Sequence, residues 1–176
     1  MEVTLFGVIE TKTETRDRAK RLAELYASLR DAPGAIGCRK GHTMDLQYFI
    51  DRSRKRRMGP NDWDGLHRLI GDPEYLLTDR ERAAHRRNPK NWRRYKYGWL
   101  NQPPGQKWPC CMHPKEVAYL VGQLDELQDE IVAIELSIPE IQAEAKALRD
   151  IGPIPKDVAD RYGLTEAGEP KPKEKA

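Results

Sequence analysis

Apolar residues between positions 114 and 150 recur in a strict alternation of three- and four-residue steps. The series runs for more than four heptads and consists of Val117, Leu120, Leu124, Leu127, Ile131, Ile134, Ile138, Ile141, Ala145 and Leu148. Such spacing places the side chains on one stripe of a helix, and Asp and Glu residues flank that stripe. The pattern predicts a long acidic helix over 114–150, whose seam packs against another copy or against a helix of the same chain.

A proline interrupts this helical pattern at one point. Ser137 and Glu140 have the spacing of a capping box around Pro139, and a proline inside a helix removes one backbone hydrogen bond. Two forms of the segment therefore remain open, a kinked helix and a helix that breaks at 137–139 and folds back.

The rest of the chain predicts short elements. The branched and aromatic run within 3–9 predicts a strand, and Thr15 can cap an amphipathic helix that Pro33 and Gly34 would end. A glycine-flanked loop over 37–42 would precede a helix from Thr43 to about Arg57. The expected fold class is mainly α, with at most one or two short N-terminal strands, short corner helices and the one long coiled-coil-like helix.

Three short helix starts follow Pro60. Asp72-Pro73 and Asn88-Pro89 each place a capping residue before a proline, and Thr78 with Glu81 forms a capping-box pattern. The last signal predicts a helix over 89–97. On that helix Trp92, Tyr95 and Trp99 would share one face, whose spacing is typical of core packing.

Four regions are expected from these signals. They are an N-terminal strand and helix (1–37), a basic Trp-rich module (38–113), the acidic heptad helix (114–150), and a linker with a largely disordered tail (151–176). The phrase Asp157 to Thr165 resembles the first helix and turn of a helix-turn-helix unit, but the proline- and charge-rich sequence after it is not that of a recognition helix.

Charge is sorted along the chain into blocks. Residues 80–107 hold nine Lys or Arg against the single acid Glu81, and 38–57 hold seven bases against two acids, whereas the whole chain carries only +3. Cations displace counterions from phosphates, and aromatic rings set among them offer stacking faces. The blocks predict a surface that binds nucleic acid or an acidic protein.

The predicted function is non-enzymatic nucleic-acid binding, with the heptad helix mediating self-association or docking. The candidate phosphate contacts are Arg54, Lys55, Arg56, Arg57, Arg86, Arg87, Lys90, Arg93, Arg94 and Lys96. The alternative function is a structural component of a virion, ribonucleoprotein or other assembly, whose basic face meets an acidic partner. A solvated, charged helix end would also account for part of the 54–57 cluster.

Two further sites are suggested by single residues. Cys38 with His42 and Cys110 with His113 have ligand-like spacing, so together they could hold a zinc ion, although 67 residues separate the pairs. His67, His85 and Asn88 invite comparison with His-Asn-His endonucleases, but the Asp-Gly and downstream Asn-rich elements of that family are absent after His85. A metal-dependent nuclease is the third function considered.

Hydropathy and cysteine usage indicate the compartment. No run approaches the roughly 20 apolar residues that span a bilayer, and the N-terminus lacks the pattern of a signal peptide. Three cysteines, two of them adjacent, make a poor disulfide framework. We expect an intracellular protein, cytoplasmic, nucleoid-associated or nuclear, or a virion component if it is viral.

Overall fold

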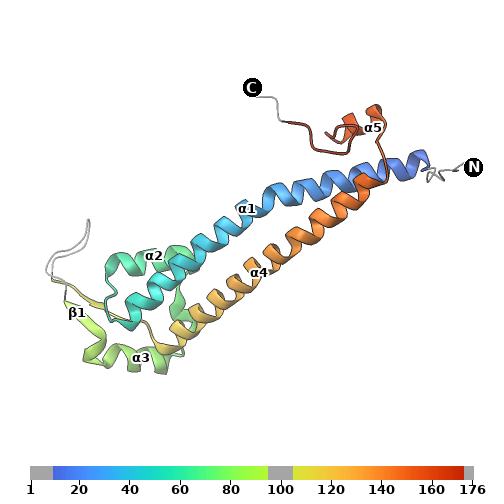
Figure 1. Cartoon of the computed structure of the whole chain (residues 1–176). Coiled ribbons are helices and arrows are strands. Elements are labelled where there is room, and N and C mark those ends of the chain that lie inside the picture. Colours follow the sequence, from blue (N-terminus) through green and yellow to red (C-terminus); the bar gives the residue numbers. More distant parts are fainter. Residues whose placement is uncertain (1–9, 95–104, 173–176) are drawn as a thin grey trace, which may run out of the picture. The chain divides into compact units, whose positions relative to one another are not determined.

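The computed structural model describes residues 10–94 and 105–172 and confirms a mainly α fold (Figure 1). Two three-residue strands pair antiparallel, with Trp92 opposite Pro109 and Arg94 opposite Lys107. The elements are α1 (Lys12–Arg54), α2 (Pro60–Ile70), η1 (Pro73–Leu76), α3 (Asp79–Arg87), η2 (Pro89–Asn91), β1 (Trp92–Arg94), β2 (Lys107–Pro109), α4 (Pro114–Asp150) and α5 (Lys156–Arg161), where η marks a 3₁₀ helix.

The chain divides into two compact units. One comprises Met1–Gly37 with Val132–Ala176, and the other comprises Cys38–Ile131, so the boundary falls inside both α1 and α4. Within each unit, part of α1 packs against part of α4 and the two segments run antiparallel. Each unit therefore has its own hydrophobic core.

The first unit is built around Leu22 and Leu25 of α1, which pack with Ala145 of α4. Arg18 is buried and donates to the carbonyl oxygens of Leu148 and Gly152 at 3.1 and 2.9 Å. These carbonyls lie at the C-terminal end of α4, where helical hydrogen bonds run out, so Arg18 satisfies acceptors that the helix leaves unpaired.

The C-terminal segment belongs to the core of the first unit. Ile154, Ala159 and Leu164 are each 1% exposed and pack with the α1 and α4 residues named above. A backbone bond from Ile154 to Glu166 and a bridge between Leu164 and Pro170 close the turn after α5. The expectation of a largely disordered tail is therefore wrong for the described residues up to 172, because three apolar side chains of this segment find a buried surface.

The second unit forms around Leu46, Phe49 and Ile50 at the end of α1. Trp63 and Leu66 of α2 pack on these residues, together with Met58, Met112 and Leu120. Trp63 also donates its indole N–H to the carbonyl oxygen of Pro109 at 2.8 Å, which fixes β2 against α2. The basic, Trp-rich sequence is thus built around a small hydrophobic core.

The heptad prediction is confirmed as one helix, α4, and the structure resolves both questions that the sequence left open. The seam packs within the chain, because Val117 and Leu120 face the second core and Ile141 and Ala145 face the first. The helix also continues through Pro139, and Ser137 donates to the carbonyl oxygen of Ile134 rather than starting a new helix.

Helix α1 corrects three predictions at once. It runs unbroken over 43 residues through Pro33, and the predicted loop over 37–42 and N-cap at Thr43 lie inside it. A proline inside a helix costs about 3 kcal/mol. Apolar residues on both sides of Pro33 pack into cores, and such packing outweighs local propensity.

The short helix starts are mostly confirmed. Asp72, Thr78 and Asn88 each accept a hydrogen bond from a backbone N–H two or three residues later. The helix predicted over 89–97 is wrong, because one 3₁₀ turn ends at Asn91 and the chain then pairs with β2. The N-terminal strand predicted within 3–9, and Tyr95, Lys96 and Trp99, lie outside the described residues.

Burial of Leu164 generates a stability prediction. The substitution Leu164→Ala should lower the free energy of unfolding by about 2–5 kcal/mol, because it leaves a cavity in a packed core. Urea unfolding followed by circular dichroism measures this loss. The control Leu136→Ala removes a leucine that is 66% exposed and should change stability by less than about 0.5 kcal/mol. Equal, negligible effects of the two changes would mean that the segment is not part of the core.

Candidate functional site

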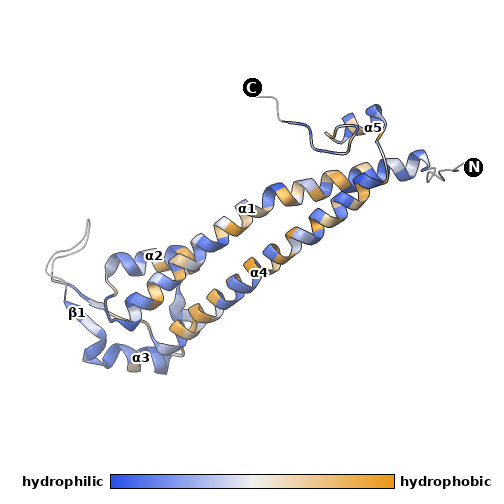
Figure 2. Ribbon diagram, in the orientation of Figure 1, coloured by the Kyte–Doolittle hydropathy of each residue, from blue (hydrophilic) through white to orange (hydrophobic). Residues whose placement is uncertain are grey.

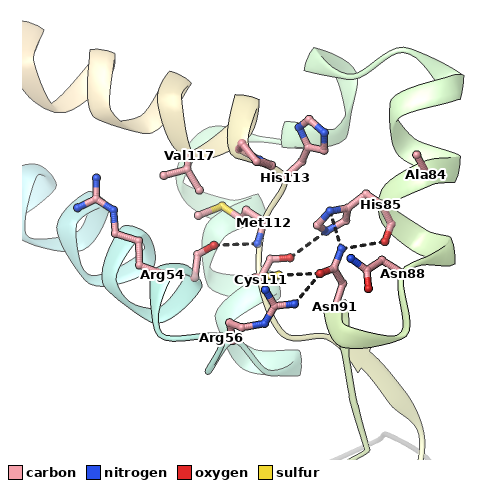
Figure 3. A pocket seen from close by; sticks show the side chains of 12 residues that line it. Arg54, Arg56, Ala84, His85, Asn88, Asn91, Cys111, Met112, His113 and Val117 are labelled. Atoms are coloured by element: carbon pink, nitrogen blue, oxygen red, sulfur yellow. Dashed lines mark hydrogen bonds between the residues drawn. The ribbon is translucent and has the colours of Figure 1, made fainter.

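A buried asparagine joins segments of the second unit that are far apart in sequence. The amide nitrogen of Asn91 donates to the Nδ1 atom and the carbonyl oxygen of His85, both at 2.9 Å. Its amide oxygen accepts from the Arg56 guanidinium at 2.6 Å, and its backbone oxygen accepts from the Cys110 N–H at 2.8 Å. Figure 3 shows Asn91 between Arg56 from the turn after α1, His85 from α3 and Cys111 from the segment before α4. We call this group of contacts the Asn91 junction.

The junction fixes the protonation of His85. Nδ1 accepts a hydrogen bond from the Asn91 amide, so Nε2 carries the ring proton and donates to the carbonyl oxygen of Cys111 at 3.1 Å. Burial lowers the pKa of His85, which agrees with a neutral ring. Both ring nitrogens are thus engaged, and His85 is a structural group here rather than a free base.

The backbone of Arg56 has a strained conformation. Its φ of 52° makes it the one non-glycine residue with positive φ in the described ranges. The guanidinium donates to the carbonyl oxygen of Lys90 as well as to Asn91, each at 2.6 Å. Charged hydrogen bonds to the chain hold this unusual conformation. Arg56 therefore positions the basic segments through its Nη2 group, which makes both contacts.

The four predicted zinc ligands are not gathered. Cys38 is exposed on α1 one turn from His42, whereas Cys110 is buried before α4. Within residues 10–94 and 105–172 there is no group of three or more His, Cys, Asp or Glu side chains placed to hold a metal ion. In this structure the four residues therefore do not come together as a zinc site. Zinc binding stays a prediction that the metal content of the purified protein would test.

The adjacent thiols are packed rather than activated. Cys110 donates to the carbonyl oxygen of Lys90 at 3.5 Å, and Cys111 donates to the Asn91 amide oxygen at 3.6 Å. Burial raises the pKa of the Cys111 thiol, so the nucleophilic thiolate is disfavoured. His67 and His85, the histidines of the nuclease comparison, line different cavities, and His85 shares its cavity with Asn88.

The Asn91 junction places two basic stretches side by side. Arg56 belongs to the 54–57 cluster, and its contact with Lys90 brings that cluster against the segment 86–94. Several exposed cations of these stretches and of β2 have no ion pair within residues 10–94 and 105–172. They are Arg54, Lys55, Arg57, Arg87, Lys90, Arg93 and Lys107, which we call the basic surface.

The pairing of β1 with β2 places two like charges next to each other at this surface. Arg94 lies directly opposite Lys107 in the register, and Arg94 donates its Nε–H to the carbonyl oxygen of Gly105 at 3.1 Å. Like charges directly opposite each other across strands destabilise the pair. No carboxylate of the described residues pairs with either cation, so an external anion between them would relieve the repulsion.

Arg86 differs from its neighbours because it is paired. Its guanidinium contacts both carboxylate oxygens of Glu74, at 2.7 and 2.9 Å. Helix α3, which carries Arg86 and Arg87, has no buried residue and is mostly hydrophilic in Figure 2. Ion pairs and caps therefore position α3: Arg86 ties its last turn to Glu74, and Glu81 ties its first turn to Lys115 at 2.6 Å.

Trp92 lies between two cavities instead of in a core. It is half-buried in β1, belongs to neither hydrophobic cluster, and donates its indole N–H to the carbonyl oxygen of Arg86 at 2.6 Å. One cavity, of about 430 Å³, is lined by Trp63, His67, Glu74, Arg86, Trp92, Gln106, Lys107, Trp108 and Pro109. The other, of about 330 Å³, is lined by Arg86, Arg87, Pro89, Trp92 and Lys107.

Sequence reasoning missed two residues of this site. Asn91 carries no charge and matches no motif, so nothing in the sequence distinguishes it from a loop asparagine. Lys107 belongs to the basic block over 80–107, but it lies 11 residues from Lys96 in sequence and nothing local marks it as a phosphate contact. Only the pairing of β1 with β2 brings it beside Arg94 and Trp92.

Comparison with known proteins adds no function. No protein-family model, curated protein or solved structure matches this chain. Among the helices within the described residues, none combines the length and the apolar content that a membrane span needs.

The Glu81 contacts generate a pH prediction. The Lys115 ammonium and the backbone and hydroxyl of Thr78 lower the pKa of Glu81 from 4.5 to about 2. Because this folded-state pKa is depressed, the stabilisation is present above pH 4.5 and is lost as the pH falls toward about 2. We expect Glu81→Gln to destabilise the protein at pH 6 and to lose this effect near pH 2.

Urea midpoints at a series of pH values measure the difference between the wild type and Glu81→Gln. The matched control is Glu140→Gln, which removes an exposed carboxylate without an ion pair in the described residues. A stability difference for Glu81→Gln that stayed constant from pH 6 to pH 2 would contradict the assigned role.

Proposed function

We propose that this protein is a non-enzymatic nucleic-acid-binding protein and that the basic surface contacts phosphates. One observation carries the proposal: the Asn91 junction joins two basic stretches about 30 residues apart in sequence, and their exposed cations lack carboxylate partners in the described residues. Cations that were needed only for folding would be expected to pair with the chain's own acids, as Arg86 does.

The charge arrangement supports a polyanion rather than a single small anion. The unpaired cations come from α1, the turn after it, α3, η2 and both strands, so they spread over several elements. A phosphate backbone carries regularly repeated charges and releases counterions when Lys and Arg neutralise them. Binding of this kind is steeply salt-dependent and weakly sequence-specific.

The chemistry of the neighbouring groups supports binding rather than catalysis. His85 uses both ring nitrogens within the fold, and burial raises the pKa of the Cys111 thiol. A general base or nucleophile needs a free lone pair within reach of a substrate. These two residues would first have to break existing hydrogen bonds.

The role proposed for α4 is narrower than the sequence suggested. Its seam packs on α1 within the chain, so self-association through that seam would have to displace α1. Docking of a partner would use another face of the helix, for example the one that exposes Val132 and Leu136.

Charge reversal on the basic surface tests the proposal. We expect the triple variant Arg87→Glu, Lys90→Glu, Arg93→Glu to bind DNA and RNA oligonucleotides more than about tenfold weaker at low salt. The slope of log affinity against log salt should also flatten by about two for a single strand, since each lost phosphate contact contributes about 0.7. Fluorescence anisotropy over a range of salt concentrations measures both quantities.

The control variant carries the same change of charge in the first unit. It is Arg16→Glu, Lys146→Glu, Lys156→Glu, which alters three exposed cations without an ion pair in the described residues. It should keep most of the wild-type affinity. If both variants weakened binding equally, net charge and not this surface would be responsible. If the wild type bound an acidic peptide but no oligonucleotide, the protein would instead belong to the assembly class.

A further inference from the structure

The two cavities beside Trp92 differ in charge although they share a border. Arg86, Trp92 and Lys107 line both. The smaller cavity adds Arg87 and no carboxylate, whereas the larger one adds Glu74 and the rings of Trp63 and Trp108. An anionic group is therefore favoured in the smaller cavity, and an uncharged aromatic group is favoured in the larger one.

The rings of the larger cavity are held in fixed orientations. The indole N–H of Trp92 donates to the carbonyl oxygen of Arg86, and that of Trp63 donates to the carbonyl oxygen of Pro109. These hydrogen bonds hold both rings in one orientation. Trp63 is 8% exposed and Trp108 is half-buried against the second core, whereas Trp92 lies outside both cores. Rings that are already ordered lose little entropy when another ring stacks on them.

The polar lining suits the edge of a nucleobase. Gln106 is exposed, and its side-chain amide offers both a donor and an acceptor. Glu74 would repel a phosphate, but its carboxylate is already bound by Arg86. A volume of about 430 Å³ lies in the range of small-ligand cavities.

We propose that the larger cavity takes one unpaired base of a single-stranded nucleic acid, while the adjoining phosphate lies in the smaller cavity against Arg87 and Lys107. This inference rests on the proposed function and makes it more specific. A base that is paired and stacked in a duplex cannot enter the cavity, so the protein should prefer single strands. Stacking on aromatic side chains is tolerant of base identity, so any of the bases would serve.

Comparison with an abasic strand distinguishes the contribution of the bases to binding from that of the phosphates. The probe is a fluorescein-labelled oligothymidine of about 12 nucleotides, which spans a typical single-strand site. The matched probe has a tetrahydrofuran abasic residue at every position and the same number of phosphates. We expect the wild type to bind the intact strand about 5- to 100-fold tighter than the abasic strand, as stacking of one base implies.

Substitutions at Trp92 assign the preference to this ring. Trp92→Leu keeps an apolar side chain without a stacking face and should bind both strands with the affinity of the abasic one. Trp92→Phe keeps a ring and should retain part of the preference. Thermal unfolding followed by circular dichroism checks that each variant is folded.

A measurement on the wild type keeps the test decisive if a Trp92 variant is unfolded. Indole N–H resonances report each tryptophan separately in a nitrogen-15 spectrum, and single Trp→Phe variants assign them. The intact strand should shift the resonances of Trp63, Trp92 and Trp108, and the abasic strand should leave at least those of Trp63 and Trp108 unchanged.

The possible failures are distinguishable. Equal affinity for the intact and abasic strands would overturn the base cavity and leave phosphate binding by the basic surface in place. A preference that survived in folded Trp92→Leu would place the base elsewhere on the protein. Absence of binding to any oligonucleotide at low salt would overturn this inference together with the proposed function.

Discussion

The fully hydrogen-bonded side chain of Asn91 joins the segments of the second unit that carry the basic surface. Its amide nitrogen donates hydrogen bonds to His85, and its amide oxygen accepts hydrogen bonds from Arg56 and Cys111. A buried amide with an unmet donor or acceptor costs about 1–3 kcal/mol, so partial loss of these contacts is strongly disfavoured. The network thereby fixes where α1 ends relative to α3 and the segment before α4, and with that the positions of the cations these segments carry.

The cations of the basic stretches fall into two groups, those that pair within the chain and those that do not. Arg56 donates to Asn91 and Arg86 pairs with Glu74, so both of these exposed arginines hold segments of the fold together. Arg87, Lys90 and Arg93 stay exposed beside them without an internal partner in the described residues. Crowding unpaired cations, including Arg94 opposite Lys107, raises the energy of the free protein. A polyanion would offset that cost on binding, which is the physical basis of the proposed function.

Prediction from sequence succeeded where a signal is local and failed where distant segments compete. The capping residues Asp72, Thr78 and Asn88 act on their own first turn, and all three were identified correctly. The proline at position 33 is an equally local signal, but packing on both sides of it keeps α1 helical. Trp92 had helical spacing with its neighbours, yet pairing with Pro109 draws it into a strand.

The sequence by itself determined the long helix over 114–150 and the concentration of cations in 80–107, because periodicity and charge are properties of the chain alone. Tertiary structure decided which helix the seam packs on, that Ile154, Ala159 and Leu164 join a core, and which arginines pair within the chain. Each of these depends on partners far away in sequence. The same guanidinium is a scaffold group beside Asn91 and a candidate phosphate contact in open solvent, and only the fold distinguishes the two.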